Sequence, residues 1–312
     1  MPFFVAFSLL FFCTTLSNIH SYSIIHHVSI MKKMKKLLLL LFVSVCVACQ
    51  SDQTERILAQ IISVLPEEEP AVEEILTADA DTGIIVQAND YPFCVREVEG
   101  DQILLRSSYA VCYDAANKIP RWVEWILTAE HTTGNQPRLN NFLPDEDVAE
   151  PRAELADYKG SGFDRGHMCP AGDNKWGYEP MRESFLLTNV CPQDQNLNSG
   201  DWNELESQCR EWAKQYGELY IACGPILRKA KGRTIGKNRV RVPEAFFKVV
   251  LCPSGTPKAL GFIYENKPCN RPLSAYVVTV DEVERQTGLD FFPFLDKAVE
   301  AQVEASVRLE DW

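Results

Sequence analysis

Histidine is scarce in this chain of 312 residues, and its scarcity limits the available chemistry. Only His131 and His167 of the five histidines lie beyond residue 49, so a site with three histidine ligands is excluded there. No Gly-x-Ser-x-Gly motif occurs, and Gly236-Lys237 is followed by Asn238 rather than Ser or Thr. The sequence therefore argues against a serine hydrolase and against a P-loop nucleotide-binding protein.

Net positive charge is also absent. The chain has 31 basic and 43 acidic residues and a formal net charge of −12, which excludes a uniformly basic nucleic-acid coat but not a local basic patch. Residues 228–241 hold seven basic side chains and no acid. A solvated loop and a phosphate-facing loop are both open, and the second interpretation predicts substrate contacts. The substrate-binding candidates are Arg228, Lys229, Lys231 and Arg233.

Residues 31–48 have the pattern of a lipoprotein signal peptide. Four lysines precede an apolar run over residues 37–47, which is too short to span a bilayer. Val47-Ala48-Cys49 is similar to a bacterial lipoprotein cleavage box, so we expect export and lipidation at Cys49. The expected location is the bacterial cell envelope, with periplasmic and surface-exposed placement both open. Plain secretion and an uncleaved anchor are the alternatives.

The rest of the chain divides into three further parts. Residues 1–30 carry no charged side chain, and we interpret them as a non-native leader before a true start at Met31 or Met34. Residues 49–82 read as an acidic tether, and residues 83–312 as one domain. Eight cysteines follow Cys49, and an even number in an exported chain predicts disulfides of open pairing. None of the eight forms a Cys-x2-Cys pair, which makes a zinc ribbon a poor fit.

Strand and helix patterns alternate irregularly, which favours an α+β fold over regular βαβ winding. Apolar side chains at helical spacing predict a helix over residues 202–216, capped by Asp201 and ended by Gly217. A second helix is expected after Thr279, ending near Gly288. Segments rich in β-branched and aromatic residues predict strands at 103–113, 122–130, 219–222, 246–251, 259–264 and 276–280.

The chemistry-bearing candidates lie in two short segments. In Asp164-Arg165-Gly166-His167, a strand would place Arg165 and His167 on one side, where a neutral imidazole beside a guanidinium suits a base acting near an anionic substrate. His131 takes a structural interpretation. Downstream, Asn198 offers a neutral oxygen ligand that suits Mg²⁺, and Glu206 lies eight residues further along a predicted helix, in reach of the metal through water.

These residues fall in a pattern that resembles the DNA/RNA non-specific endonuclease family, whose sites are ββα-metal (His-Me finger) motifs. The resemblance covers about residues 95–295 and implies a central antiparallel sheet flanked by helices. The matching segments are Pro120-Arg-Trp-Val-Glu-Trp125, Asp164-Arg-Gly-His167, Thr188-Asn189, Asn198-x3-Trp202-x3-Glu206, Ile221-Ala-Cys-Gly-Pro225, Val242-Pro-Glu-Ala-Phe-Phe-Lys-Val249 and Val278-Thr-Val-Asp-Glu-Val-Glu-Arg-Gln-Thr-Gly288.

The resemblance implies a role for each matching residue. His167 would be the general base, Asn198 the direct metal ligand and Glu206 its partner through water. Arg165 and Arg138 would contact phosphate, with Arg152 a competing candidate in the same loop. Asn189 would orient the site. The cysteines two residues past His167 and Asn189 are interpreted as disulfide partners that stiffen it.

The resemblance also implies a function. It predicts a Mg²⁺-dependent endonuclease, with Mn²⁺ as the alternative cation, that cuts DNA and RNA through backbone contacts and leaves 5′-phosphate and 3′-hydroxyl ends. A catalytically inactive, envelope-anchored nucleic-acid-binding protein is the alternative. Monomer and homodimer both stay open.

Overall fold

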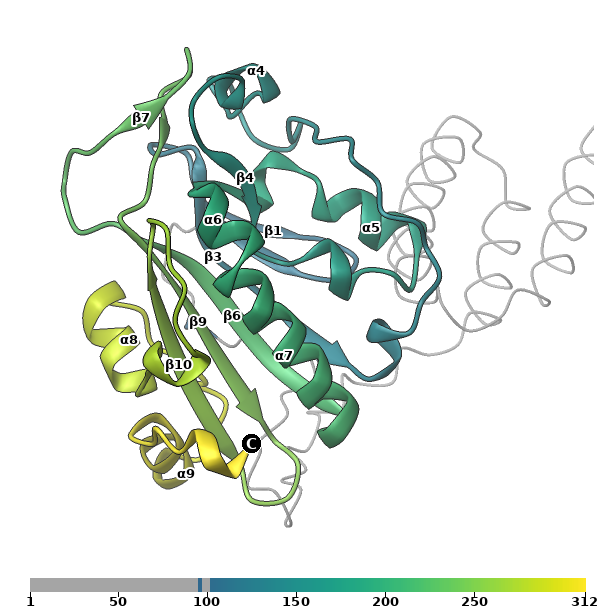
Figure 1. Cartoon of the computed structure of the whole chain (residues 1–312), viewed down its shortest axis with the longest axis vertical. Coiled ribbons are helices and arrows are strands. Elements are labelled where there is room, and N and C mark those ends of the chain that lie inside the picture. Colours follow the sequence, from purple (N-terminus) through teal and green to yellow (C-terminus); the bar gives the residue numbers. More distant parts are fainter. Residues whose placement is uncertain (1–94, 97–101) are drawn as a thin grey trace, which may run out of the picture. The chain divides into compact units, whose positions relative to one another are not determined.

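A seven-stranded antiparallel sheet forms the centre of the protein (Figure 1). The computed structural model describes residues 95–96 and 102–312, which lie within the compact unit Glu74–Trp312. The leader, signal peptide, tether, Cys49 and Cys94 fall outside the described residues. The spatial order of the strands is β1 (Gln102–Leu105), β2 (Ala110–Asp114), β3 (Ile119–Thr128), β6 (Glu218–Ile226), β9 (Ala245–Cys252), β10 (Lys258–Glu265) and β11 (Val277–Val278).

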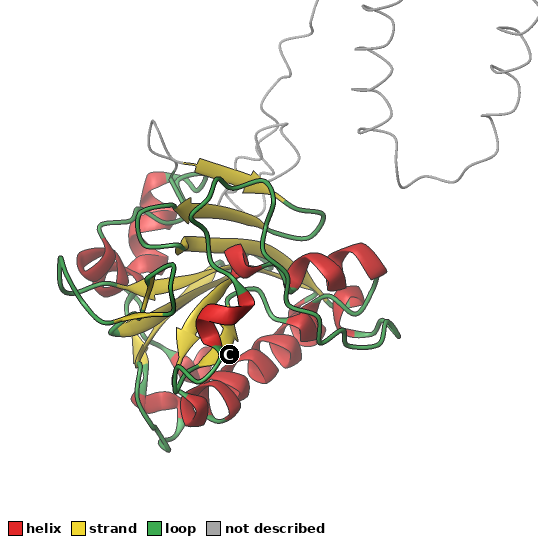
Figure 2. Ribbon diagram, turned by 90° about the horizontal axis from the view of Figure 1, so that it is seen from above, coloured by secondary structure: helices red, strands yellow, loops and turns green. Residues whose placement is uncertain are grey.

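Both faces of this sheet are covered, which explains the apolar sequence of its central strands. Every residue of β9 is buried, and β6 is buried from its second residue onward. Strands buried on both sides read as continuous apolar runs rather than as alternating patterns. Two separate clusters of buried side chains result, one on each face. Figure 2 shows helices on either side of the strands.

Helix α7 (Asp201–Tyr216) packs on one face through a stripe that includes Trp202, Leu205 and Trp212. On the opposite face, α8 (Val280–Thr287) and α9 (Lys297–Glu304) bury Val283 and Val303 in the second cluster. The shorter helices are α4 (Leu155–Tyr158), α5 (Tyr178–Ser184) and α6 (Gln195–Ser199). None of the helices in the described part of the chain is long and apolar enough to cross a membrane.

The α+β class and the two predicted helices are confirmed. The Thr279 hydroxyl accepts a hydrogen bond from the Glu282 amide at 3.0 Å, and Gly217 and Gly288 end their helices with positive φ. The predicted cap at Asp201 is wrong, because its carboxylate instead accepts hydrogen bonds from the Arg271 amide and a tyrosine hydroxyl. Gly200 occupies the cap position.

Two of the predicted strands are longer than the strands in the structure. Residues 103–113 form a hairpin of β1 and β2, because the Arg106 amide bonds back to the Tyr109 carbonyl at 2.8 Å and turns the chain. Residues 276–280 supply only the two-residue strand β11 before α8 begins. The hairpin of β7 (Thr234–Ile235) and β8 (Val240–Arg241) lies in the basic segment, where no strand was predicted.

The structure shows free thiols at six of the cysteines for which disulfides were predicted. Cys169, Cys191, Cys209, Cys223 and Cys252 are buried and free, and Cys269 is partly exposed and free. Three of them, Cys191, Cys223 and Cys252, lie on strands whose inner faces build the core, so their side chains fill apolar space. The interpretation of Cys169 and Cys191 as disulfide partners that stiffen the site is therefore wrong.

A second, two-stranded sheet carries the candidate site. Strand β4 (Asp164–His167) pairs antiparallel with β5 (Val190–Gln193), and α6 and α7 follow directly, which gives a β-β-α order. Gly166 lies against the side chain of Gln193, and a Cβ atom at Gly166 would come within 2.1 Å of its Oε1 atom. The close pairing of the two strands therefore requires glycine at this position.

We expect Gly166→Ala to destabilise the protein by about 1–3 kcal/mol, because the new methyl group forces Gln193 out of place. Denaturant unfolding of Gly166→Ala, Gln193→Gly and the double variant measures this coupling. In the Gln193→Gly background the alanine should cost much less. Equal costs in both backgrounds would contradict the described contact.

Candidate nuclease site

A cavity of about 390 Å³ is lined by residues of β4, α6 and α7. These three elements lie next to one another in Figure 1. The cavity brings together residues that are far apart in the sequence, and it includes five of the predicted site residues. These five are Arg138, Arg165, His167, Asn198 and Glu206. The remaining wall comes from Pro170, Ala171, Gly172, Ser199, Asn203 and Arg210.

His167 ends β4 and lies at the apolar side of this cavity. Its ring contacts Phe142, with centroids 5.0 Å apart, and Phe185, with centroids 4.9 Å apart and the planes almost perpendicular, and the two phenyl rings also contact each other. The side chain is buried, and its Nε2 atom has no hydrogen-bond partner among the described residues. Because His167 also lines the cavity, its ring is placed to accept a proton from a molecule bound there.

The surroundings keep the His167 ring neutral. Its pKa is lowered to about 3, first because burial disfavours the charged form and then because Arg138 and Arg165 repel a second positive charge. At neutral pH the imidazole is therefore unprotonated. The other described histidine, His131, stacks on Trp176 at 4.9 Å and lies outside the cavity lining.

Two of the three arginines that line the cavity are held by the same aromatic rings that contact the histidine. The Arg165 guanidinium lies 4.6 Å from the centre of the Phe142 ring, and that of Arg138 lies 5.2 Å from the centre of the Phe185 ring. Both arginine residues are exposed, so their charges remain accessible to an anion. Arg152, the competing candidate, instead donates to the Val148 carbonyl at 3.0 Å and does not line the cavity.

Asn198 presents an oxygen atom to the cavity. Its Nδ2 atom donates to the Asp164 carboxylate at 3.0 Å, which fixes the amide group and leaves Oδ1 unengaged by the described residues. The Asn198 amide oxygen, with the Glu206 carboxylate in the same cavity lining, suits a cation such as Mg²⁺, which retains most of its water ligands. The donor set of Asn198 and Glu206 therefore fits the metal that the motif implies.

Glu206 lines the same cavity from α7. Burial raises its pKa to about 7, while the charge of Lys248 opposes this effect and that of Asp173 adds to it. Lys248 is fully buried on β9, and its Nζ atom lies 4.7 Å from the centre of the Trp202 ring and 5.1 Å from that of Trp125. The lysine thus supplies a buried positive charge behind the cavity wall.

Sequence reasoning missed several of these supporting residues. Asp173 accepts hydrogen bonds from Arg210 at 2.9 Å and from the Trp125 indole at 3.1 Å, which ties the cavity wall to the sheet. A single lysine within the apolar strand that contains Lys248 was a visible signal, because a buried charge needs specific surroundings. Phe142 gave no comparable signal, because its position beside His167 arises only from the fold.

Asn189 does not line the cavity. Its side chain is completely buried, accepts a hydrogen bond from the Cys169 amide at 2.9 Å and donates to the carbonyls of Cys169 and Ser184. These bonds fix the chain two residues after His167. In the structure Asn189 acts on the backbone that positions the histidine, and it does not face the cavity itself.

The four basic candidates of residues 228–241 also lie outside the cavity lining. Arg228 forms an ion pair with Glu265 at 2.7 Å and donates a hydrogen bond to Gln286. The Glu265 carboxylate therefore offsets much of its positive charge. Arg233 lies over the Phe163 ring at 4.5 Å, next to the start of β4. Lys229 and Lys231 are exposed.

Comparison with known proteins identifies relatives of this arrangement. A model of the DNA/RNA non-specific endonuclease family matches residues 94–298. The chain is 33% identical over 255 residues to mitochondrial nuclease EXOG of Xenopus laevis, which covers 76% of this chain and 66% of that protein. It is 37% identical over 210 residues to mitochondrial nuclease EXOG of Mus musculus, which covers 62% of this chain and 57% of that protein.

Two further comparisons agree with these. Mitochondrial endonuclease G of Homo sapiens is 36% identical over 207 residues, covering 62% of this chain and 70% of that protein. The crystal structure of an EndoG/EndoGI complex aligns with a TM-score of 0.61 and 32% identity, covering 63% of this chain and 88% of that chain. The chain thus spans less than two thirds of the length of the two EXOG relatives.

The environment of His167 predicts a pH dependence of stability. The unfolded chain takes up a proton near pH 6.5, whereas the folded protein does so only near pH 3, so lowering the pH from 7 to 5 destabilises the folded state. His167→Phe keeps an aromatic ring and removes this effect. We expect its stability relative to the wild-type protein to increase by about 2 kcal/mol between pH 7 and pH 5.

Urea unfolding of both proteins at the two pH values measures this difference. His131 is present in both proteins, so its titration cancels. A stability difference that does not change with pH would mean that the folded protein protonates His167 as readily as the unfolded chain does.

Proposed function

Because the chain belongs to the DNA/RNA non-specific endonuclease family, we propose that it is a metal-dependent endonuclease that hydrolyses phosphodiester bonds in DNA and RNA. The observation that carries this proposal is the buried, neutral His167, which lines one cavity together with Arg138, Arg165 and the Asn198 side chain. This cavity offers a base, an anion clamp and an oxygen ligand together.

In the proposed reaction His167 accepts a proton from the attacking water molecule, whose oxygen bonds to phosphorus while the bond from phosphorus to the 3′ oxygen breaks. The departing 3′ oxygen takes a proton from solvent water and leaves as a hydroxyl group. Arg165 and Arg138 stabilise the negative charge that grows on the phosphate oxygens. Since water is the nucleophile, the ribose 2′-hydroxyl is not required, and the same residues act on DNA and RNA. The products carry 5′-phosphate and 3′-hydroxyl ends, and recognition uses the backbone rather than the bases.

Asn198 would hold a divalent cation directly, and Glu206 would contact it through water. Mg²⁺ is the proposed ion and Mn²⁺ the alternative. When bound, such a cation supplies Lewis-acid stabilisation of a phosphate oxygen and of the leaving oxygen. The exposed Lys229 and Lys231, together with Arg228 and Arg233, are proposed to contact the phosphate backbone outside the cavity, so binding should weaken with salt.

We expect His167→Ala to lower the rate of plasmid nicking by at least about 100-fold, because the loss of a general base typically costs 10²–10⁴ in rate. His131→Ala removes the other described histidine, which lies outside the cavity, and should retain activity. Supercoiled DNA and a structured RNA should both be cut with Mg²⁺, and neither should be cut in EDTA.

Three outcomes of this assay would contradict the proposal. Nicking by His167→Ala at the wild-type rate would remove His167 as the base. Cutting that continues in EDTA would remove the metal. Retardation of DNA in a gel by a wild-type protein that never cuts it would instead indicate a catalytically inactive nucleic-acid-binding protein.

We also propose that the chain is exported and lipidated at Cys49, on the basis of the lysines and apolar run that precede this residue. Expression of the full chain in a bacterial host should yield a membrane-bound protein whose N-terminal peptide begins at Cys49 and carries a lipid mass. Cys49→Ser should shift the protein to the soluble fraction. An unmodified Cys49 in the wild-type protein would contradict lipidation.

A further inference from the structure

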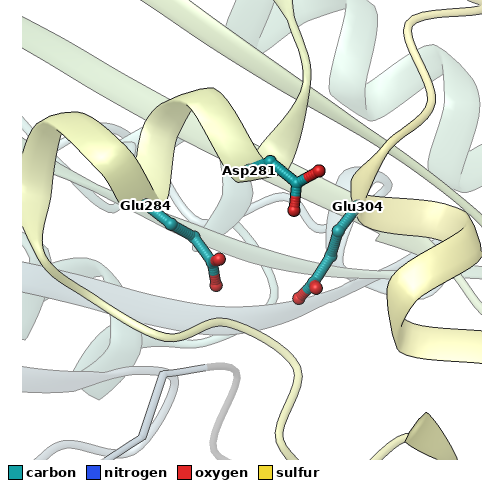
Figure 3. A group of neighbouring side chains, drawn as sticks. All are labelled: Asp281, Glu284 and Glu304. Carbon is teal, nitrogen blue, oxygen red and sulfur yellow. The ribbon is translucent and has the colours of Figure 1, made fainter.

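Three carboxylates meet on the face of the sheet opposite the His167 cavity. Asp281 and Glu284 project from α8, and Glu304 projects from the end of α9 toward them (Figure 3). The helices that carry them pack on the second core cluster, whereas α7 and the cavity belong to the first. No residue of this acidic cluster lines the proposed nuclease site.

The separations within the acidic cluster match those around a single ion. One carboxylate oxygen from each of the three residues lies within 4.8 Å of the others. Oxygen ligands on opposite sides of a calcium ion, each at about 2.3–2.6 Å, are about 4.6–5.2 Å apart. Magnesium retains most of its water ligands and is usually held by only one or two carboxylates, whereas calcium binds about six to eight oxygen atoms. Three carboxylates within reach of one ion therefore favour calcium.

Glu304 gives an independent reason to expect a ligand. It is only 7% exposed, yet its Oε1 atom is buried without a hydrogen-bond partner, and its carboxylate is aimed at the other two (Figure 3). A buried oxygen without a partner costs about 1–3 kcal/mol or more. Glu304 is also the last residue of α9, where the helix dipole disfavours a negative charge.

The nearby cations do not neutralise these groups. Lys297 pairs with Glu300 at 2.5 Å, and Arg96 pairs with Asp290. Each of these basic side chains is thus already matched by an acid outside the cluster. Besides Glu284 and Asp281, the carboxylates of Glu300 and Asp290 also lie close enough to Glu304 to repel its negative charge. Excess negative charge is therefore a property of the whole region.

We propose that Asp281, Glu284 and Glu304 form a structural site for one calcium-like divalent cation that joins α8 to α9. Glu284 is already fixed, because its Oε1 atom accepts a hydrogen bond from the Phe291 amide at 2.8 Å. The exposed Asp281 leaves the site open to solvent on one side, so that water completes the coordination shell. The ion supplies the partner that Glu304 lacks and holds α9 against the back of the sheet.

The test uses the purified full chain, stripped with EDTA, and Ca²⁺ alone as the probe. At a hundredfold excess over Kd, we expect Ca²⁺ to raise the Tm by roughly 5–10 °C, and Mg²⁺ at the same concentration to raise it less. Glu304→Gln should abolish the Ca²⁺-dependent rise. Glu310→Gln removes an exposed carboxylate of the same C-terminal segment and should leave the rise intact.

Further variants separate this site from the nuclease cavity and from a folding defect. In Asn198→Ala the rise should persist, whether or not that variant cuts DNA, so the failure of one proposal does not decide the other. Asp281→Asn changes an exposed position and should reduce the rise if Glu304→Gln does not fold. Two results would contradict the site: a wild-type Tm that does not change when Ca²⁺ is added, or a full Ca²⁺-dependent rise in the cluster variants. Either result would show that protons rather than a cation neutralise the carboxylates.

Discussion

The candidate site depends on the burial of one neutral imidazole against two aromatic rings. Phe142 and Phe185 exclude water from His167 and also support the guanidinium groups of Arg165 and Arg138. The same packing therefore lowers the pKa of the base and places positive charge beside it. A base that stays neutral next to two cations is compatible with a polyanionic substrate, because the arginines attract phosphate without protonating the histidine.

The surrounding structure serves to hold this arrangement. Gly166 allows β4 and β5 to pair closely, and Asn189 fixes the backbone just after His167. Asp164 on β4 accepts a hydrogen bond from the Asn198 amide on α6 and so fixes the orientation of that amide. Behind α7, the buried charges of Lys248 and Asp173 influence the pKa of Glu206. The face of the large sheet that packs against α7 therefore supports the site. The opposite face packs against α8 and α9, which carry the separate acidic cluster.

The parts of the site that lie within short sequence motifs could be predicted. Asp164-Arg-Gly-His167 and Asn198-x3-Trp202-x3-Glu206 predicted residues that share one cavity, and the apolar spacing predicted α7. Phe142 could not be predicted, because its contact with the histidine depends on a loop path that no local pattern encodes. The even cysteine count misled for a similar reason, since strand positions facing the core place these thiols in apolar packing.

In the proposed mechanism, His167 and a cation held by Asn198 act on the same phosphate group. The most direct test is an anomalous difference map from a crystal of the His167→Ala protein with Mn²⁺ and a short DNA duplex. The account predicts a manganese peak about 2.1–2.2 Å from Asn198 Oδ1 with a DNA phosphate beside it. A peak found only elsewhere in the protein, or a phosphate bound away from the position of residue 167, would contradict it.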